Sequence, residues 1–311
     1  AVNLAAAGPL VSLFLEWASR KWGAVLGDEV ARRLSRDALV AFAVGAVIGG
    51  AFLAVLWRNE GDPFVVALLR FSAAKLWFAG GELVFYVLCQ GAYVAMWRRP
   101  WKQTPAGRVA HRLLAILAAT NLLYHFPPMM AVIGEIAAGK LAAPEVIDAA
   151  AYRELAFTPA VASRSLHHIL AAVALAGLYA AIAACRLLPR SAGEASRIAA
   201  WGARIALIAT VLQIPVGIWV LLSLENNRAL MGDSLLATAL FIVAVVAALA
   251  LMHHLAAIAF GDVTRKAVLT AAALFVFVVV TMTATLVFSR AGARPKAFSV
   301  SAGHVRFDFK E

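Results

Sequence analysis

The sequence predicts an all-α fold, a polytopic transmembrane helix bundle of about eight spans. Of its 311 residues, 63% are hydrophobic and only 14% are charged, and the mean hydropathy is +0.84, well outside the usual balance of a soluble domain. Several apolar runs reach the roughly 17–25 residues with which a helix crosses the hydrocarbon core while satisfying its own backbone hydrogen bonds. The alternating pattern of a membrane β-barrel is absent, so we expect helical spans.

Apolar runs between charged breaks place the spans in chain order. We predict one helical bundle over 1–290 and a polar C-terminal tail over 291–311. The first run opens directly on apolar residues, which fits a short span, an interfacial helix or the end of a longer helix, and disfavours a cleavable signal peptide because no basic region precedes it. The predicted spans are 1–17, 38–57, 76–97, 108–130, 163–188, 198–223, 234–260 and 267–289.

Three local features refine these spans. A continuous helix over 64–97 would be about 50 Å long, which exceeds the bilayer core, so we expect 64–75 to lie along the interface. Gly45 and Gly49 form a G-x-x-x-G pattern that predicts a close helix contact on the second span. Pro215 is expected to kink the sixth.

Basic residues predict the orientation. The net charge is +11, but the basic residues lie in short loops beside the spans and not in one block, so nucleic acid is not an expected partner. The loops after spans one, three, five and seven are the more basic, which places them in the cytoplasm and both termini in the periplasm of a bacterial inner membrane. Those loops contain Arg20, Lys21, Arg32, Arg33, Arg36, Arg98, Arg99, Lys102, Arg108, Arg186, Arg190, Arg197, Arg265 and Lys266.

The two cysteines are not expected to form a disulfide or to bind a metal ion. Cys89 and Cys185 lie inside apolar runs, where a buried, inert thiol is the expected state. The sequence has no C-x-x-C-H motif, so no c-type haem is expected to be covalently attached.

The fourth span carries a histidine near each end. In A-H-R-L-L-A-I-L-A-A-T-N-L-L-Y-H-F-P-P, residues 110–128, His111 and His125 are fourteen positions apart. At 100° per residue this is about 40° short of four full turns, so both project from nearly the same helix face, about 21 Å apart along the axis. One histidine is therefore expected near each membrane surface.

Other spans carry histidines at the same two depths. His167 and His168 begin the fifth span, level with His125, and His253 and His254 lie near the end of the seventh, level with His111. Facing histidines are what a b-type haem requires, because its iron takes two axial imidazoles while the ring lies between helices. We predict an outer haem b on His125 with His167 or His168, and a second on His111 with His253 or His254. Interhelical hydrogen bonding is the alternative role for each.

The first half of the chain resembles subunit I of the cytochrome bd quinol oxidases, over about 190 residues. The matching segments are G-P-L-V-S-L-F-L-E-W, the later G-D and R-R-L-S-R, a glycine-rich second helix, G-A-Y-V-A-M-W at 91–97, N-L-L-Y-H-F-P at 121–127 and S-L-H-H-I-L-A-A at 165–172. The resemblance implies a haem-holding bundle in which His167 aligns with the family's axial histidine. His125 occupies a position that the family's N-x-W-M-x-x-P pattern does not use for a ligand.

The departures from that family are equally informative. The G-R-Q-P-W signature, the long quinol-binding loop and the first-helix histidine ligand have no counterpart, and the paired glutamates of the third helix reduce to Glu82, out of register. The resemblance therefore argues against a working terminal oxidase.

Glu82 is the candidate catalytic residue. A carboxylate inside a span is costly unless it is paired or protonated, so it could carry a proton during quinol oxidation, or it could pair with a hydroxyl or amide of a neighbouring helix. We expect Asn121 and Gln90 to form interhelical hydrogen bonds, and Trp97 and Tyr124 to belong to the aromatic belts.

These observations favour a membrane b-type cytochrome subunit within a larger complex of membrane subunits. It would transfer electrons between a quinone pool and a periplasmic carrier such as cytochrome c. The alternative is a haem-free structural or anchoring subunit of a respiratory or photosynthetic complex. A transporter has less support, because no inverted repeat is evident.

Overall fold

The computed structural model describes residues 1–23, 25–59, 61–223 and 234–292. This part of the chain is all-α, as predicted, and it includes eight helices long and apolar enough to cross a membrane. Most of the predicted polar tail, 293–311, lies outside the described residues. The helices are α1 (Val2–Trp22), α2 (Val25–Trp57), α3 (Pro63–Leu69), α4 (Ala73–Met96), η1 (Pro100–Gln103), α5 (Pro105–Ala137), α6 (Ala149–Ala156), α7 (Pro159–Cys185), α8 (Ala192–Leu222), α9 (Leu235–Phe260) and α10 (Arg265–Gly292).

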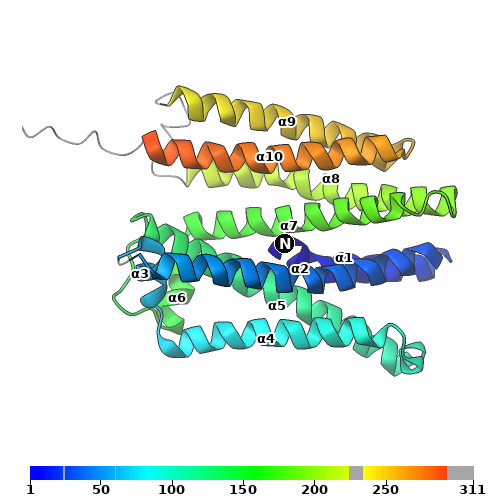
Figure 1. Cartoon of the computed structure of the whole chain (residues 1–311), viewed down its shortest axis with the longest axis horizontal. Coiled ribbons are helices and arrows are strands. Elements are labelled where there is room, and N and C mark those ends of the chain that lie inside the picture. Colours follow the sequence, from blue (N-terminus) through cyan, green and yellow to red (C-terminus); the bar gives the residue numbers. More distant parts are fainter. Residues whose placement is uncertain (24, 60, 224–233, 293–311) are drawn as a thin grey trace, which may run out of the picture.

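The long helices run side by side, and Figure 1 shows them as one bundle. Helices α9 and α10 form one edge and α4 with α5 the other, while α1, α2, α7 and α8 lie between them. Two ends can be named from the short elements. The η1 end holds the chain reversals α1–α2, α4–α5, α7–α8 and α9–α10, and the α3/α6 end holds α3 and α6.

Side-chain caps explain where several helices begin. The carboxylate of Asp62 accepts hydrogen bonds from the first backbone amides of α3, and the hydroxyls of Ser72 and Thr104 cap α4 and α5. Between α3 and α4 the chain is extended, with Ile147 N donating to Arg70 O at 2.7 Å and Ser72 N to Ile147 O at 3.0 Å. The structure thus confirms that 64–97 is not one helix, because the span begins only at Ala73.

Helices α7 and α8 approach each other closely at two glycines. A Cβ atom added to Gly177 would lie 2.7 Å from the carbonyl oxygen of Gly202, so the absence of side chains lets these two backbones approach each other. The G-x-x-x-G of α2 does less than predicted. Gly45 meets only the start of α1, at Val2, and Gly49 faces open space.

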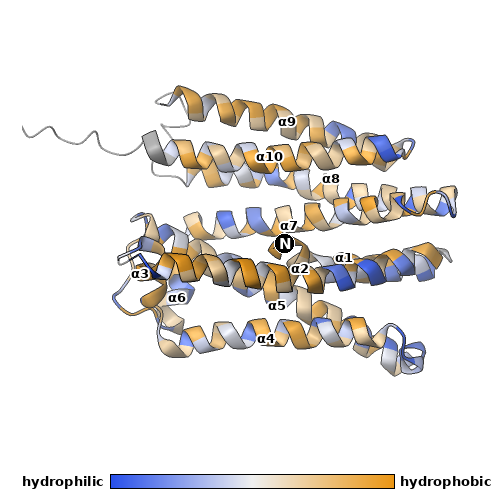
Figure 2. Ribbon diagram, viewed as in Figure 1, coloured by the Kyte–Doolittle hydropathy of each residue, from blue (hydrophilic) through white to orange (hydrophobic). Residues whose placement is uncertain are grey.

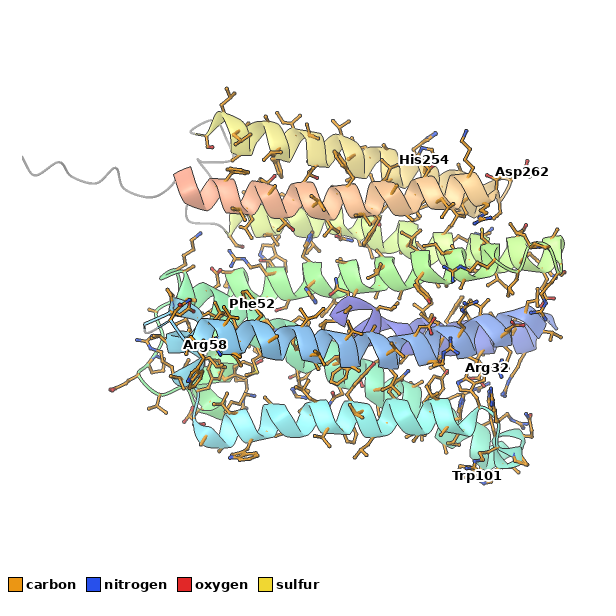
Figure 3. The ribbon with its side chains drawn as sticks, in the orientation of Figure 1. Arg32, Phe52, Arg58, Trp101, His254 and Asp262 are labelled. Atoms are coloured by element: carbon orange, nitrogen blue, oxygen red, sulfur yellow. The ribbon has the colours of Figure 1, made fainter. Side chains whose placement is uncertain are left out.

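Hydropathy follows the bundle geometry. Figure 2 shows the long helices as largely apolar along their middle, with hydrophilic residues gathered toward the helix ends. Arg32 and Trp101 lie toward the η1 end, whereas Phe52 and Arg58 lie toward the α3/α6 end (Figure 3). The predicted cytoplasmic loops therefore share one end of the molecule.

Candidate functional site

Glu82 lies on α4, and its carboxylate faces two residues of α5. The side-chain amide of Asn121 donates to its Oε2 atom, and the Nε2 atom of His125 lies 3.8 Å from its Oε1 atom. The side chains of His125 and Glu82 are 31% and 20% exposed, and the ring of Phe78 packs edge-on against His125 at 5.5 Å. Of the alternatives expected for Glu82, the hydrogen bond to an amide of a neighbouring helix is therefore formed.

His167 and His168 lie near the start of α7, and each has a buried ring nitrogen. Among the described residues, neither Nδ1 of His167 nor Nε2 of His168 has a hydrogen-bond partner. A buried polar atom without a partner costs free energy, so such atoms call for a ligand, an ion or a water molecule. Nε2 of a neutral imidazole is a common metal-binding atom, and the unsatisfied Nε2 belongs to His168, whereas the family resemblance pointed to His167.

The structure places His125 at the depth of His168 but turns it toward another helix. The ring of Phe126 lies 6.4 Å from that of His168, so the predicted depth match holds between α5 and α7. Consecutive helical side chains differ by about 100° in direction. Phe126 therefore points toward α7, while His125 points toward Phe78 and Glu82 on α4.

The histidines predicted to hold the second haem, His111 with His253 or His254, are not brought together. His111 is completely buried on α5, which packs against α1, α4 and α7, whereas α9 packs against α8 and α10. His253 and His254 lie on α9, with ring centroids 5.8 Å apart, and Figure 3 shows His254 on the edge of the bundle far from α4. We therefore place no haem on His111, His253 or His254.

His111 instead belongs to a cluster of charged and titratable side chains at the η1 end, which we call the η1 cluster: Glu16, Arg20, Asp28, Lys102 and His111. Nδ1 of His111 lies 3.1 Å from Oε2 of Glu16, and Nζ of Lys102 lies 3.5 Å from Oε1 of the same carboxylate. Burial lowers the pKa of Lys102, and the nearby carboxylates of Glu16 and Asp28 oppose that shift.

Aromatic side chains of α4 close this cluster. Tyr93 and Trp97 pack against His111 with centroid distances of 4.2 and 5.0 Å, and the ammonium of Lys102 lies 3.2 Å from the Trp97 ring centroid. Trp97 is 8% exposed, so its assignment to an aromatic belt is wrong. Its ring stabilises a desolvated cation instead.

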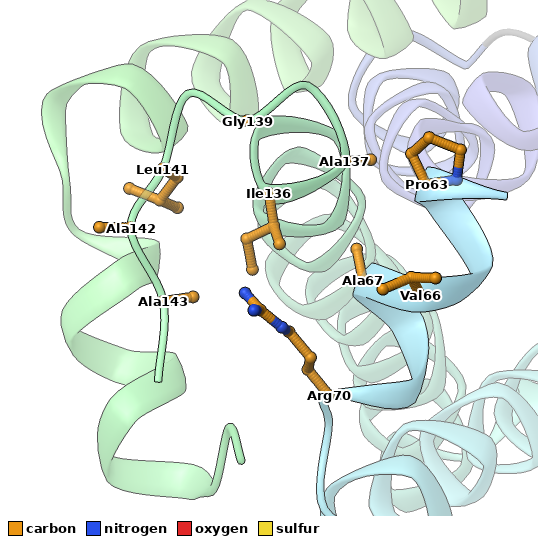
Figure 4. A pocket seen from close by; sticks show the side chains of 10 residues that line it. All are labelled: Pro63, Val66, Ala67, Arg70, Ile136, Ala137, Gly139, Leu141, Ala142 and Ala143. Carbon is orange, nitrogen blue, oxygen red and sulfur yellow. The ribbon is translucent and has the colours of Figure 1, made fainter. Parts of the chain in front are cut away.

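An open hollow lies at the α3/α6 end between α3 and the segment that follows α5. Its volume is about 440 Å³, and Figure 4 shows the guanidinium of Arg70 pointing into it between Ile136 and Ala143. Among the described residues that line the hollow, Arg70 alone is charged. This lining offers no acid-base pair and no metal-ligand set.

The described residues contain no group of three or more His, Cys, Asp or Glu side chains placed to hold a metal ion. No family model matches the chain, and no curated protein sequence matches it.

Glu16 and Lys102 are the site residues that sequence reasoning missed. A signal for Glu16 was present, because L-F-L-E-W sets one carboxylate at the end of an apolar run, where an ionisable group requires a partner. Lys102 was assigned to a cytoplasmic loop as a topology signal. Nothing in its local sequence shows that η1 folds its side chain inward, to 3% exposure.

Proposed function

We propose that this chain is a b-type cytochrome subunit of a bacterial inner membrane, in which α7 supplies an axial histidine to one haem b. His168 is the first ligand, with His167 as its neighbouring substitute, and His125 on α5 is the second. The subunit transfers electrons between a quinone pool and a periplasmic carrier, together with other membrane subunits. The resemblance to subunit I of the bd oxidases supports this proposal for the first half of the chain.

The observation that carries the proposal is the pair of unsatisfied imidazole nitrogens on α7. Nε2 of His168, on a membrane-spanning helix, is buried without a partner among the described residues, and a haem iron held by this nitrogen would remove that cost. The Phe126 contact with His168 supports the depth match that a bis-histidine haem requires. The inner site lacks such support, because both ring nitrogens of His111 face other protein groups.

The bundle's own residues would position and insulate the cofactor. A haem supplies one-electron chemistry when it is bound. His125 must turn from Glu82 toward α7 in order to act as the second ligand, and Asn121 would then remain as the partner of the Glu82 carboxylate. Glu82 is then available as a proton carrier that is only partly exposed, on a helix that packs against α5.

A difference spectrum tests the proposal. We expect the protein purified from its native membrane to show a b-type α band in the reduced-minus-oxidised spectrum. His168→Ala should remove that band, and His125→Ala should weaken or convert it. His253→Ala is the matched control, because it removes an exposed histidine on α9 and should leave the band intact. A native preparation with no b-type band refutes the proposal.

A haem-free anchoring subunit is the second candidate. It is favoured by the hydrogen bond from Asn121 to Glu82 and by the nearby His125, since polar groups that pair across α4 and α5 are typical of structural interhelical contacts. Iron analysis separates the two functions. Stoichiometric co-purification with partner subunits, without iron, supports the anchoring role.

A further inference from the structure

The η1 cluster contains two buried groups that cannot both be satisfied without an additional proton. Glu16 is 1% exposed and His111 is fully buried. Nε2 of His111 lies 3.1 Å from the backbone carbonyl oxygen of Tyr93. A carbonyl oxygen only accepts hydrogen bonds, so Nε2 must carry a hydrogen and donate it.

This assignment determines the state of the other ring nitrogen. In a neutral imidazole with hydrogen on Nε2, Nδ1 presents a lone pair. That lone pair would face Oε2 of an ionised Glu16 at 3.1 Å, and both atoms would then be buried polar groups without a hydrogen bond. One proton between them removes the conflict, whether it rests on Nδ1 as an imidazolium or on Oε2 as a carboxylic acid.

The surrounding charges determine how firmly this proton is held. Arg20 lies 2.8 Å and Lys102 3.5 Å from Oε1 of Glu16, while Asp28 lies 3.8 Å from Lys102. Around the Glu16–His111 pair, α1 contributes Arg20, α2 contributes Asp28, η1 contributes Lys102, and α4 contributes the buried phenol of Tyr93, whose hydroxyl also faces Glu16, and the ring of Trp97. The cations beside Glu16 stabilise its carboxylate but repel an additional positive charge on His111, so they act in opposite directions on the shared proton.

A short route connects this pair to water. The side chain of Asp28 is 49% exposed and that of Arg20 is 33% exposed, so the rim of the cluster is hydrated at the η1 end. Lys102 lies between Asp28 and Glu16 with its ammonium in reach of both. No group in this route depends on a cofactor.

We propose that Glu16 and His111 form a proton-binding site within the bundle, loaded from the η1 end past Asp28 and Lys102. The site binds one proton per chain in the folded protein at neutral pH. This proposal is independent of the haem proposal, because it uses neither α7 nor the α3/α6 end of the molecule.

The pH dependence of unfolding measures the bound proton. Above about pH 7.5 an unfolded histidine is mostly neutral and an unfolded glutamate ionised, so unfolding would release one proton from the pair. The unfolding equilibrium constant of the wild type in mixed micelles should therefore rise about tenfold per pH unit relative to Glu16→Gln. The amide that this substitution introduces would donate a hydrogen to Nδ1 of a neutral His111, so the variant keeps the hydrogen bond and lacks the proton.

Glu29→Gln is the matched control. It makes the same chemical change at the same end, where Glu29 pairs with Arg190 at 2.8 Å on the surface, and it should keep the wild-type slope. Equal slopes in the wild type and in Glu16→Gln overturn the proposal.

A second measurement does not depend on the stability of the glutamine variant. Nitrogen-15 spectra of histidine-labelled wild type, with His111 assigned by His111→Gln, should show both ring nitrogens protonated at about pH 8, where a free histidine is neutral. If His111 is neutral, infrared spectra should show one protonated carboxyl group that Glu16→Gln lacks. A neutral His111 together with an ionised Glu16 overturns the proposal.

Discussion

Gly177→Ala tests the contact that holds α7, the helix of His167 and His168, against α8. The new Cβ would lie 2.7 Å from Gly202 O and 2.8 Å from Ala206 N. Both are backbone atoms, so no side-chain rotation relieves the overlap. The helices must part by about 0.7 Å, the difference between 2.7 Å and the 3.4 Å at which ordinary contact begins.

The expected cost follows from that separation. A radial gap of about 0.5–1 Å forfeits a quarter to a half of the dispersion energy of the contacts it opens, and overpacking of this kind costs about 1–3 kcal/mol. Part of this is offset, because alanine is favoured over glycine inside a helix by about 0.8–1 kcal/mol. With this offset subtracted, the expected net loss for Gly177→Ala is about 0–2 kcal/mol, about 1 kcal/mol at the middle of the range.

Gly217→Ala is the control on α8 itself. Nothing lies within 4 Å of an added Cβ at Gly217, so only the helix-propensity gain remains, about 0.8–1 kcal/mol. In mixed micelles, the free energy of unfolding of Gly177→Ala should therefore be lower than that of the wild type, and that of Gly217→Ala should be higher. Equal free energies of unfolding for Gly177→Ala and Gly217→Ala would refute the close-contact argument.

The double variant of Gly177 and Gly202 sharpens the test. A Cβ on Gly202 would lie 2.6 Å from Gly177 O, so both substitutions force the same separation of the two helices. Once one substitution has separated α7 from α8, the second substitution should lower the free energy of unfolding by less. The sum of the single losses should therefore exceed the loss in the double variant by at least about 0.5 kcal/mol.

Three further predictions concern the α3/α6 end. Burial raises the pKa of Tyr152 to about 12, so the folded state favours the neutral phenol. The stability that this preference contributes is complete below about pH 10 and is lost as the pH rises from about 10 to 12. Tyr152→Phe should not show this loss in unfolding measurements. Glu135→Ala removes a buried carboxylate that pairs with Arg164 and should cost about 3 kcal/mol in denaturant unfolding, most of it recovered when Arg164→Met is added. Asp148 accepts from the first amides of α6 at 3.0 and 2.9 Å, so Asp148→Ala should cost about 1 kcal/mol and speed proteolysis there, whereas Asp148→Asn should not.

Most of the fold could be predicted because a bilayer leaves few alternatives. A spanning segment must be helical, apolar and about 20 residues long, and these requirements located all eight spans and the break between α3 and α4. The helix contacts could not be predicted in the same way. Gly45 and Gly49 form a G-x-x-x-G without a close contact at Gly49, whereas Gly177 and Gly202, each in the less specific G-x-x-x-A pattern, approach each other backbone to backbone. Close approach depends on which faces meet, and that is a property of two helices.

The same limit governs the histidines of α5. Their fourteen-residue spacing predicts a shared helix face, and in the structure both rings do contact α4, His111 through Tyr93 and His125 through Phe78. Periodicity determines the angle between two side chains but not the rotation of the helix within the bundle. Because α5 carries apolar residues around most of its circumference, no polar face indicates that rotation. The sequence therefore predicted correctly that the two histidines share a helix face, but it could not predict which helix that face contacts.

That rotation changes what the two histidines can do. Each has a carboxylate as its acidic partner, Glu16 on α1 for His111 and Glu82 on α4 for His125. The pair of His111 and Glu16 is itself buried, and both ring nitrogens of His111 face protein atoms, whereas Asp28 at the rim of the cluster is 49% exposed. The outer pair is looser, with a 3.8 Å separation and partial exposure, so His125 can leave Glu82 for another ligand at a low cost. One helix face thus carries the proposed proton site at one end and the loosely paired His125 at the other, about 21 Å apart along the axis.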